Sequence, residues 1–161
     1  MGRVWDAPAG ANLLVSILFR TGLERPHRIT HRVAVAAARA CERVAGVTVG
    51  LKWPNDLLLD GHKLGGILTQ VGGGAGRVDY VVPGLGLNVR WAPPDAACLG
   101  EQFDPSTVLT LLLEELDAVG DDHDAEYRRR LVTLGQRVRV EMLSGDLLGT
   151  AVDVLDDGRA Q

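Results

Sequence analysis

Apolar side chains occur along this chain either in short continuous runs or at steps of three and four, and each pattern predicts a different element. Residues 11–19 are mostly apolar and show no helical period, which is typical of a largely buried strand. Residues 30–44, or 26–44 if the helix begins at Pro26, have apolar side chains at steps of three and four, which predicts a helix with one buried stripe. Gly46 is a suitable C-cap for this helix. The residues of the stripe are Val33, Ala36, Ala37, Ala40, Cys41 and Val44.

Residues 51–70 predict a ribbon of two strands joined by a tight turn. The turn is placed at Asp60-Gly61, a pair that tolerates the positive φ angles of a short hairpin. Pro54 donates no N–H, so the ribbon must bend or lie at a sheet edge there. Gly65-Gly66 removes two side chains from the second strand, which indicates close approach of a ligand or of another backbone.

The second half of the chain predicts one more strand, two helices and a final pair of strands. A strand at 78–82 continues into Gly84-Leu85-Gly86, which lacks the third glycine and following helix of a dinucleotide-binding loop, so a bulged strand is favoured. A helix is expected over 107–119 with Ser106 as its cap, and a second helix should end near Leu134. From 137 to about 155 the pattern alternates, which predicts two strands, too few for an independently stable sheet.

Composition narrows the class of protein. A chain of 161 residues with 46% hydrophobic and 24% charged residues is the size of one domain and is not disordered in general. A net charge of −4 gives no electrostatic case for nucleic-acid binding. No stretch reaches the roughly 20 apolar residues of a membrane span, and no leader segment is recognisable, so we expect a cytoplasmic protein without membrane partners.

Three groups of residues could hold a metal or a disulfide, and each has a simpler interpretation. Cys41 and Cys98 fit neither a disulfide framework nor a metal motif, and Cys41 is expected to be a buried thiol. His27 and His31 are four residues apart but have no third ligand nearby, so surface or capping histidines are favoured. The acidic run at 121–124 is expected to begin a helix, whose dipole favours negative charge there.

Five short motifs together resemble one protein family, the biotin protein ligases. They agree with the family in content and order over about ninety residues. The motifs are GRVW at 2–5, PAGANL at 8–13, KWPND at 52–56, KLGGIL at 63–68 and GLGLNV at 84–89.

The resemblance implies a fold and a domain organisation. It implies an α+β catalytic domain, similar to class II synthetases, in which helices flank a mixed sheet, followed by a small SH3-like barrel. Residues 1–134 would be a partial catalytic domain, and residues 135–161 an incomplete SH3-like domain. Of the family's G-R-G-R-x-G loop, only Gly2 and Arg3 match this chain, so we expect a fragment truncated at both ends.

The resemblance also implies a two-step reaction that uses ATP, biotin and Mg²⁺. Biotin is first activated to biotinyl-5′-adenylate and is then transferred to a lysine of the biotin carboxyl carrier domain of a carboxylase. Lys63 is similar to the catalytic lysine that contacts the biotin carboxylate and the adenylate phosphate. Lys52 is similar to a second lysine, assigned to phosphate neutralisation. Asp56 could hold Mg²⁺ or pair with Lys52, and core packing is expected for Trp53.

The remaining roles carried over from the family concern the two halves of the intermediate. For biotin, the implied contacts are Lys63, Gly65, Gly66, Leu68, Gly84 and Gly86. For ATP and the adenylate, with Trp5 stacking on the adenine and Asn88 contacting it, they are Gly2, Arg3, Trp5, Asn55 and Asn88.

Two other functions stay open. A lipoate–protein ligase would share the fold and the adenylating chemistry, although the KWPND motif resembles the biotin branch specifically. A remnant that binds biotin or its adenylate without turnover is the other alternative. A homodimer is also left open.

Overall fold

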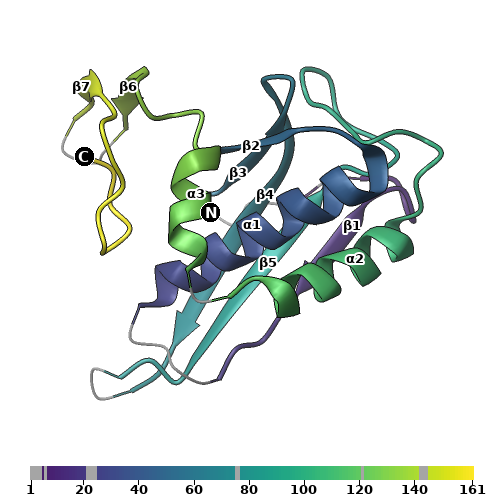
Figure 1. Ribbon diagram of the computed structural model, residues 1–161, viewed down its shortest axis with the longest axis horizontal. Helices are drawn as coiled ribbons and strands as arrows, with labels where there is room; N and C mark the ends of the chain where they lie inside the picture. Colours follow the sequence, from purple (N-terminus) through teal and green to yellow (C-terminus); the bar gives the residue numbers. More distant parts are fainter. Residues whose placement is uncertain (1–4, 6, 21–24, 75–76, 121, 142–144) are drawn as a thin grey trace.

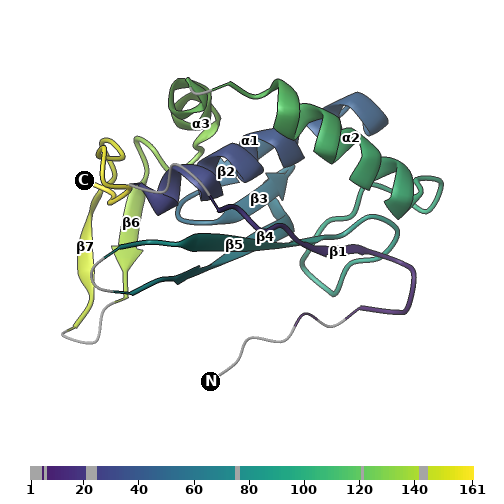
Figure 2. The ribbon, with the colours of Figure 1, turned by 90° about the horizontal axis from the view of Figure 1, so that it is seen from below.

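The main part of the molecule is one sheet with helices on one of its faces (Figures 1 and 2). The computed structural model describes residues 5, 7–20, 25–74, 77–120, 122–141 and 145–161. The elements are β1 (Leu13–Ser16), α1 (Pro26–Ala45), β2 (Val49–Lys52), β3 (Asp56–Leu59), β4 (His62–Gly72), β5 (Tyr80–Leu87), α2 (Pro105–Ala118), α3 (His123–Arg130), β6 (Arg137–Val140) and β7 (Leu147–Thr150).

The main sheet has the strand order β1-β5-β4-β3-β2, and every neighbouring pair is antiparallel. Parallel pairing among the described residues is confined to two isolated bridges, Leu51 with Leu131 and Lys63 with Ala96. The predicted α+β class is confirmed. The sheet was expected to mix parallel and antiparallel strands, but its strands are all antiparallel and, in the part of the chain that the structure describes, only these two bridges are parallel.

The central ribbon contains the predicted hairpin and one additional turn. Asp60 and Gly61 have φ angles of 50° and 80° and join β3 to β4, as the Asp-Gly pair predicts. The first half of the ribbon is divided into β2 and β3 by a turn that contains a cis Trp53-Pro54 peptide. The ribbon therefore bends at Pro54, and β2 forms one edge of the sheet.

Helix α1 is the centre of the hydrophobic core. It begins at Pro26 and ends at Ala45, where Gly46 adopts φ 68° and donates its N–H to the carbonyl of Glu42 over 2.9 Å. Its small apolar side chains pack closely against the sheet, and Cys41 is fully buried as predicted. Burial raises the pKa of the Cys41 thiol to about 12, so this group stays neutral.

Two predictions about the later helices are wrong at the residue level. The cap of α2 is Asp104, whose carboxylate accepts from the Ser106 N–H over 3.1 Å, and not Ser106 itself. Helix α3 ends at Arg130, four residues before the predicted end, because Leu131 bridges to Leu51 and the next N–H donates to the Leu51 carbonyl over 2.8 Å. Asp121, in the predicted helix entry, lies outside the described residues.

Ion pairs join α1 to α3 on the outer side of the helix layer. Arg130 contacts Glu42 at 2.7 Å and Glu126 at 2.8 Å, and its side chain is only 17% exposed. Arg39 on α1 also bonds to Glu126, through its Nε at 3.1 Å. The two glutamates share Arg130, which lowers the pKa of the Glu42 carboxyl against the effect of burial, and Arg39 and Arg130 together lower the pKa of Glu126.

Strands β6 and β7 form a separate two-stranded sheet at one end of the molecule (Figure 1). The segment after them returns to the main part of the molecule, where Val154 is buried and its carbonyl accepts from Arg128 at 2.9 Å. The Trp53 indole N–H donates to the Gly158 carbonyl over 3.0 Å. The SH3-like domain expected over 135–161 stays a prediction. None of the described helices is long and apolar enough to cross a membrane.

Candidate active site

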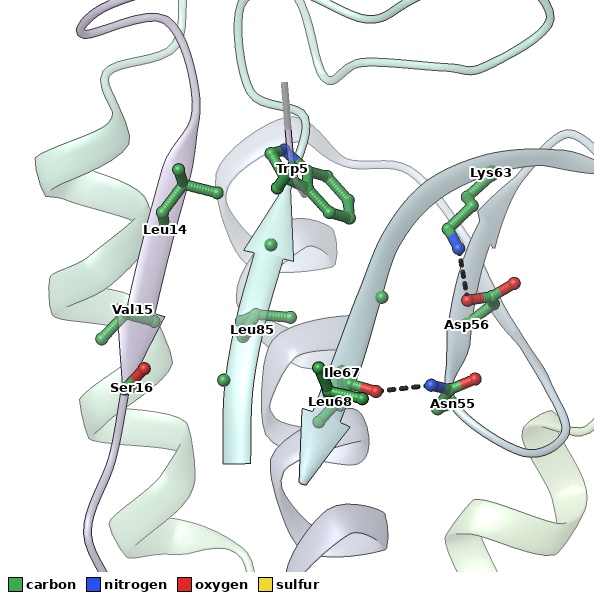
Figure 3. Close-up of a pocket in the computed structure, with 13 residues that line it drawn as sticks. Trp5, Leu14, Val15, Ser16, Asn55, Asp56, Lys63, Ile67, Leu68 and Leu85 are labelled. Atoms are coloured by element: carbon green, nitrogen blue, oxygen red, sulfur yellow. Dashed lines mark hydrogen bonds and ion pairs between the residues drawn. The ribbon is translucent and has the colours of Figure 1, made fainter. Parts of the chain in front are cut away.

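A cavity of about 440 Å³ lies on the face of the sheet opposite the helices (Figure 3). Strands β1, β4 and β5 supply most of its wall, and the turn into β3 supplies the rest. The lining residues are Trp5, Leu14, Val15, Ser16, Asn55, Asp56, Lys63, Gly66, Ile67, Leu68, Gly84, Leu85 and Gly86.

The charged groups of the cavity are an ion pair between Lys63 and Asp56. Their Nζ and Oδ1 atoms are 2.6 Å apart, and the two side chains point toward each other across the hairpin (Figure 3). The lysine side chain is 46% exposed, so its charge is accessible to a ligand in the cavity. Asp56 therefore pairs with Lys63, not with Lys52 as one of the two alternatives had it.

A bulge in β4 explains why Lys63 points into the cavity. The register with β3 pairs Leu57 with Gly65 but Leu58 with Lys63, so Leu64 is the extra residue. Successive side chains of a regular strand alternate between the two faces, so without the bulge Lys63 would lie on the opposite face from Gly66. The extra residue shifts the alternation by one position and puts both on the same face. Leu64 is fully buried in the core, while Lys63 shares the open face with Gly66.

Glycines form the floor of the cavity, and at two of them an added Cβ would crowd the side chains above. A Cβ at Gly66 would lie 3.2 Å from Oδ1 of Asp56 and 3.3 Å from Nζ of Lys63. A Cβ at Gly86 would lie 2.6 Å from the Trp5 ring. The ion pair and the indole therefore lie directly against bare backbone, and this brings both within reach of one ligand.

Asn55 holds the turn that leads into β3. Its carbonyl accepts from the Ile67 N–H over 2.8 Å, and its side-chain amide donates to the Ile67 carbonyl over 2.6 Å. These two bonds fasten the turn to β4 in the way that a paired strand would. Because Asp56 is the next residue, they also fix the position of its carboxylate.

The structure brings most of the predicted site residues together. Gly2 and Arg3 lie outside the described residues. Three other predicted residues, Lys52, Gly65 and Asn88, do not line the cavity. Those that line it are Trp5, Asn55, Asp56, Lys63, Gly66, Leu68, Gly84 and Gly86.

The three displaced residues have identifiable positions. Lys52 is exposed at the end of β2. Gly65 packs against the neighbouring strand, where a Cβ would lie 2.8 Å from the Gly86 carbonyl oxygen, so its small size serves strand packing. Asn88 is 2% exposed and its amide bonds within the protein.

Sequence reasoning missed the contribution of β1. Leu14, Val15 and Ser16 line the cavity because β1 pairs with β5, with Ser16 opposite Gly84 and Leu14 opposite Gly86. The apolar run at 11–19 predicts a strand, but the run does not show which strand it pairs with. Only the pairing with β5, the glycine-rich strand, places β1 beside the cavity.

The two histidines near the start of α1 do not form a metal site. His31 is buried, not exposed at the surface; it stacks on Tyr127 at 3.8 Å and contacts Asp124 at 3.0 Å. Burial lowers the pKa of His31 to about 4, although Asp124 opposes this shift. Among the described residues, no group of three or more side chains could hold a metal ion by itself.

An antiparallel sheet with helices on one face, and on the other face a cavity in which a lysine–aspartate pair lies over glycines, defines the architecture as α+β with an open site. The chain belongs to the biotin/lipoate A/B protein ligase family, whose family model matches residues 1–88. The resemblance found in the motifs is thereby confirmed.

Individual relatives agree with this assignment. The chain is 37% identical to the biotin–[acetyl-CoA-carboxylase] ligase of Mycobacterium tuberculosis over 98% of its own length and 66% of the relative. It is 28% identical to the bifunctional ligase/repressor BirA of Bacillus subtilis, with 98% of this chain and 55% of that protein covered. The chain thus spans about half to two thirds of these relatives.

Solved structures agree with the fold. The biotin protein ligase of Aquifex aeolicus superposes with a TM-score of 0.78 at 22% identity, covering 93% of this chain and 73% of that one. A second structure of that enzyme, in complex with biotin and ATP, gives a TM-score of 0.76 at 23% identity over 99% of this chain and 74% of that one.

Proposed function

We propose that this chain carries the catalytic part of a biotin–protein ligase. It activates biotin with ATP to biotinyl-5′-adenylate and passes the biotinyl group to a lysine of a biotin carboxyl carrier domain. The observation that carries the proposal is the position of Lys63, whose ammonium lies in a cavity floored by Gly66 and Gly86 and bordered by Trp5. Relatives that the chain matches include named biotin–[acetyl-CoA-carboxylase] ligases.

The first step joins two anions. A biotin carboxylate oxygen attacks the α-phosphorus of ATP, the bond from that phosphorus to the bridging oxygen breaks, and pyrophosphate leaves. Negative charge accumulates on the phosphoryl oxygens, and a fixed cation beside them lowers the barrier. The Lys63 ammonium is suited to this role because it contacts the carboxylate of one reactant and the phosphate of the other.

The second step releases AMP. The neutral amine of the acceptor lysine attacks the acyl carbon of the mixed anhydride, the bond from that carbon to the phosphate oxygen breaks, and a proton leaves the nitrogen. Asp56 lies 2.6 Å from Lys63 and holds the ammonium toward the carboxylate and phosphate in the first step and toward the anhydride in the second. Since the pair is partly exposed, a ligand that fills the cavity would strengthen it by displacing water.

The rest of the cavity divides between the two halves of the intermediate. The Trp5 indole is a stacking surface for the adenine, and Leu68 and Leu14 give apolar contact to biotin. Gly84 lets the ligand lie against the backbone of β5, while the space above Gly86 holds the Trp5 ring.

A magnesium ion fits the site only in combination with the nucleotide. Asp56 is the one carboxylate among the described lining residues, and Mg²⁺ commonly takes one or two carboxylates and completes its shell with phosphate and water oxygens. Asp56 would hold the ion, which would supply additional positive charge beside the phosphates. Lys63 binds the same oxyanions from the side of the hairpin.

Biotin is favoured over lipoate as the acid. The KWPND motif at 52–56 resembles the biotin branch, and the relatives named above are biotin ligases or the BirA ligase/repressor. Asn55 within this motif makes two hydrogen bonds that fix the turn beside the cavity. The motif therefore shapes the site directly.

Calorimetry with a non-hydrolysable biotinyl-adenylate analogue tests the proposal. The chain should bind the analogue, and Lys63→Ala should weaken binding about tenfold to a hundredfold, the range for losing a hydrogen bond to a charged group. Lys52→Ala is the matched comparison, because these are the only two lysines of the chain. Its loss should be smaller, since the Lys52 side chain lies outside the cavity.

The outcomes separate the alternatives. No binding of the analogue by the folded chain would contradict the proposed function. Tighter binding of a lipoyl-adenylate analogue would favour the lipoate ligase. Binding without pyrophosphate release from biotin and ATP would favour the non-catalytic remnant.

A further inference from the structure

The backbone of Lys63 lies just beyond the end of β5, so a loop takes the place of that strand beside it. On one side Lys63 pairs with Leu58 of β3. On the other side β5 has already ended at Leu87, and Lys63 is bridged instead to the loop residue Ala96. The Ala97 N–H donates to the Lys63 carbonyl over 2.9 Å. The position of the cavity lysine therefore depends on a loop.

Asn88 connects this loop to Lys63. It is 2% exposed, and its side-chain amide nitrogen donates to the Ala97 carbonyl over 3.0 Å and approaches the Lys63 carbonyl at 3.5 Å. Its amide oxygen accepts from the side chain of Asn12 over 3.2 Å. Both polar atoms of the side chain thus bond within the protein, and the amide oxygen keeps a second lone pair for the adenine contact that the resemblance implies.

Asn12 completes the connection from the other direction. Its amide oxygen accepts from the Val89 N–H at 3.0 Å and from the Trp91 N–H at 3.3 Å. The Ala11 carbonyl accepts from Arg90 in the same stretch. The two asparagines therefore fasten the segment before β1, the chain after β5 and the start of β4 to one another.

We propose that Asn12 and Asn88 are a pair of positioning residues for Lys63. They fix the backbone from which the lysine side chain reaches Asp56 above Gly66. Amide hydrogen bonds are directional, and buried ones are costly to break, so the pair holds the loop in one place. This inference rests on the proposed function, in which the Lys63 ammonium must meet two anions at once. Neither asparagine lines the cavity.

A double-mutant cycle on the full chain tests the proposal. Affinity for the biotinyl-adenylate analogue is measured for the wild type, Asn88→Ala, Lys63→Ala and the double variant. Asn88→Ala should weaken binding about tenfold, because a displacement of about 1 Å at a reacting group has large effects. In the Lys63→Ala background the same substitution should change affinity less than twofold, because residues that act through one group are not additive.

The opposite outcome has a specific meaning. If Asn88→Ala weakens binding equally in both backgrounds, the asparagine contacts the ligand itself, and the positioning role is wrong. An effect that disappears when inosine replaces adenosine in the analogue would point to the same conclusion. Failure of the wild-type chain to bind any analogue would instead contradict the proposed function, and the inference with it.

Two further variants separate positioning from general loss of stability. Asn12→Ala removes the partner of Asn88 from a half-buried position, and it should reproduce the affinity loss and its dependence on Lys63 in a folded chain. Arg32→Met is the matched control, because it removes one hydrogen bond between α1 and the Leu116 carbonyl, away from the cavity. It should lower the melting temperature without changing the affinity. Equal loss of affinity in Arg32→Met would refute the positioning role.

Discussion

Replacing Gly86 with alanine should displace the Trp5 indole from the cavity wall. The new Cβ would lie 2.6 Å from Cδ2 and Cε3 of the ring and 2.8 Å from Cε2. Non-bonded carbon atoms keep about 3.5 Å, so the ring must move by about 1 Å. The new methyl group would meet the body of an aromatic ring, so rotation of a flexible end cannot relieve the contact.

The size of the effect follows from what the indole does in the proposed complex. Stacking of a base on an aromatic side chain contributes about 1–3 kcal/mol. Complete loss of this contact in Gly86→Ala would therefore raise the dissociation constant of the biotinyl-adenylate analogue about 5-fold to 100-fold. Affinity for biotin alone should fall less, because biotin has no base to stack on Trp5.

Tryptophan fluorescence and calorimetry together measure both parts of the prediction. The chain has three tryptophans, so the emission of Trp5 is isolated in a Trp53→Phe, Trp91→Phe background. Gly86→Ala should shift that emission in the absence of ligand and should weaken analogue binding. Gly84→Ala is the control on the same strand.

At Gly84 a Cβ would make only ordinary contacts at 3.5 Å, with the Leu68 carbonyl and the Ser16 hydroxyl. Gly84→Ala should therefore leave Trp5 emission unchanged, whatever it does to biotin. Unchanged emission and affinity in Gly86→Ala would refute the reasoning. Equal emission shifts in both variants would refute it as well.

Two further predictions concern stability. Burial lowers the pKa of His31 to about 4, below its unfolded value near 6.5. The free energy of unfolding should therefore be highest above about pH 6.5 and fall by up to about 3 kcal/mol as the pH drops toward 4, because the unfolded chain binds the proton first. Urea unfolding of His31→Phe should show a smaller loss in this window, and an identical pH profile would contradict the assignment. Arg130→Met should destabilise the chain by about 2 kcal/mol, since it leaves the partly buried Glu42 and Glu126 without their shared partner. Arg139→Met, at an exposed pair, should change the urea midpoint little, and equal losses would contradict this account.

Local chemistry was enough to predict several elements from the sequence. The Asp60-Gly61 turn and the Gly46 cap are set by residues that tolerate positive φ, and both are where the pattern places them. The α1 stripe follows from periodicity alone. Features that depend on distant partners were missed: the end of α3 depends on Leu51, and the burial of His31 depends on Tyr127.

The site residues were predicted from motifs, and the sheet decides which of them line the cavity. The bulge at Leu64 decides which residues of β4 face the cavity, so Gly66 lines it while Gly65 packs against β5. No local sequence pattern predicts this one-residue bulge. The hydrogen bond between Asn88 and Asn12 was missed for a related reason, because the two residues are 76 positions apart.

The separation of the two faces of the sheet has a consequence for how such a chain can diverge. Leu13 is a core residue, while Leu14, its neighbour, is 56% exposed beside the cavity. Leu87 and Gly86 on β5 are divided in the same way between the core and the floor. Selection for a new acid substrate can therefore act on every second position and leave the scaffold intact. A library randomised only at Leu14 and Leu68 would vary the ligand preference without lowering the stability of the fold.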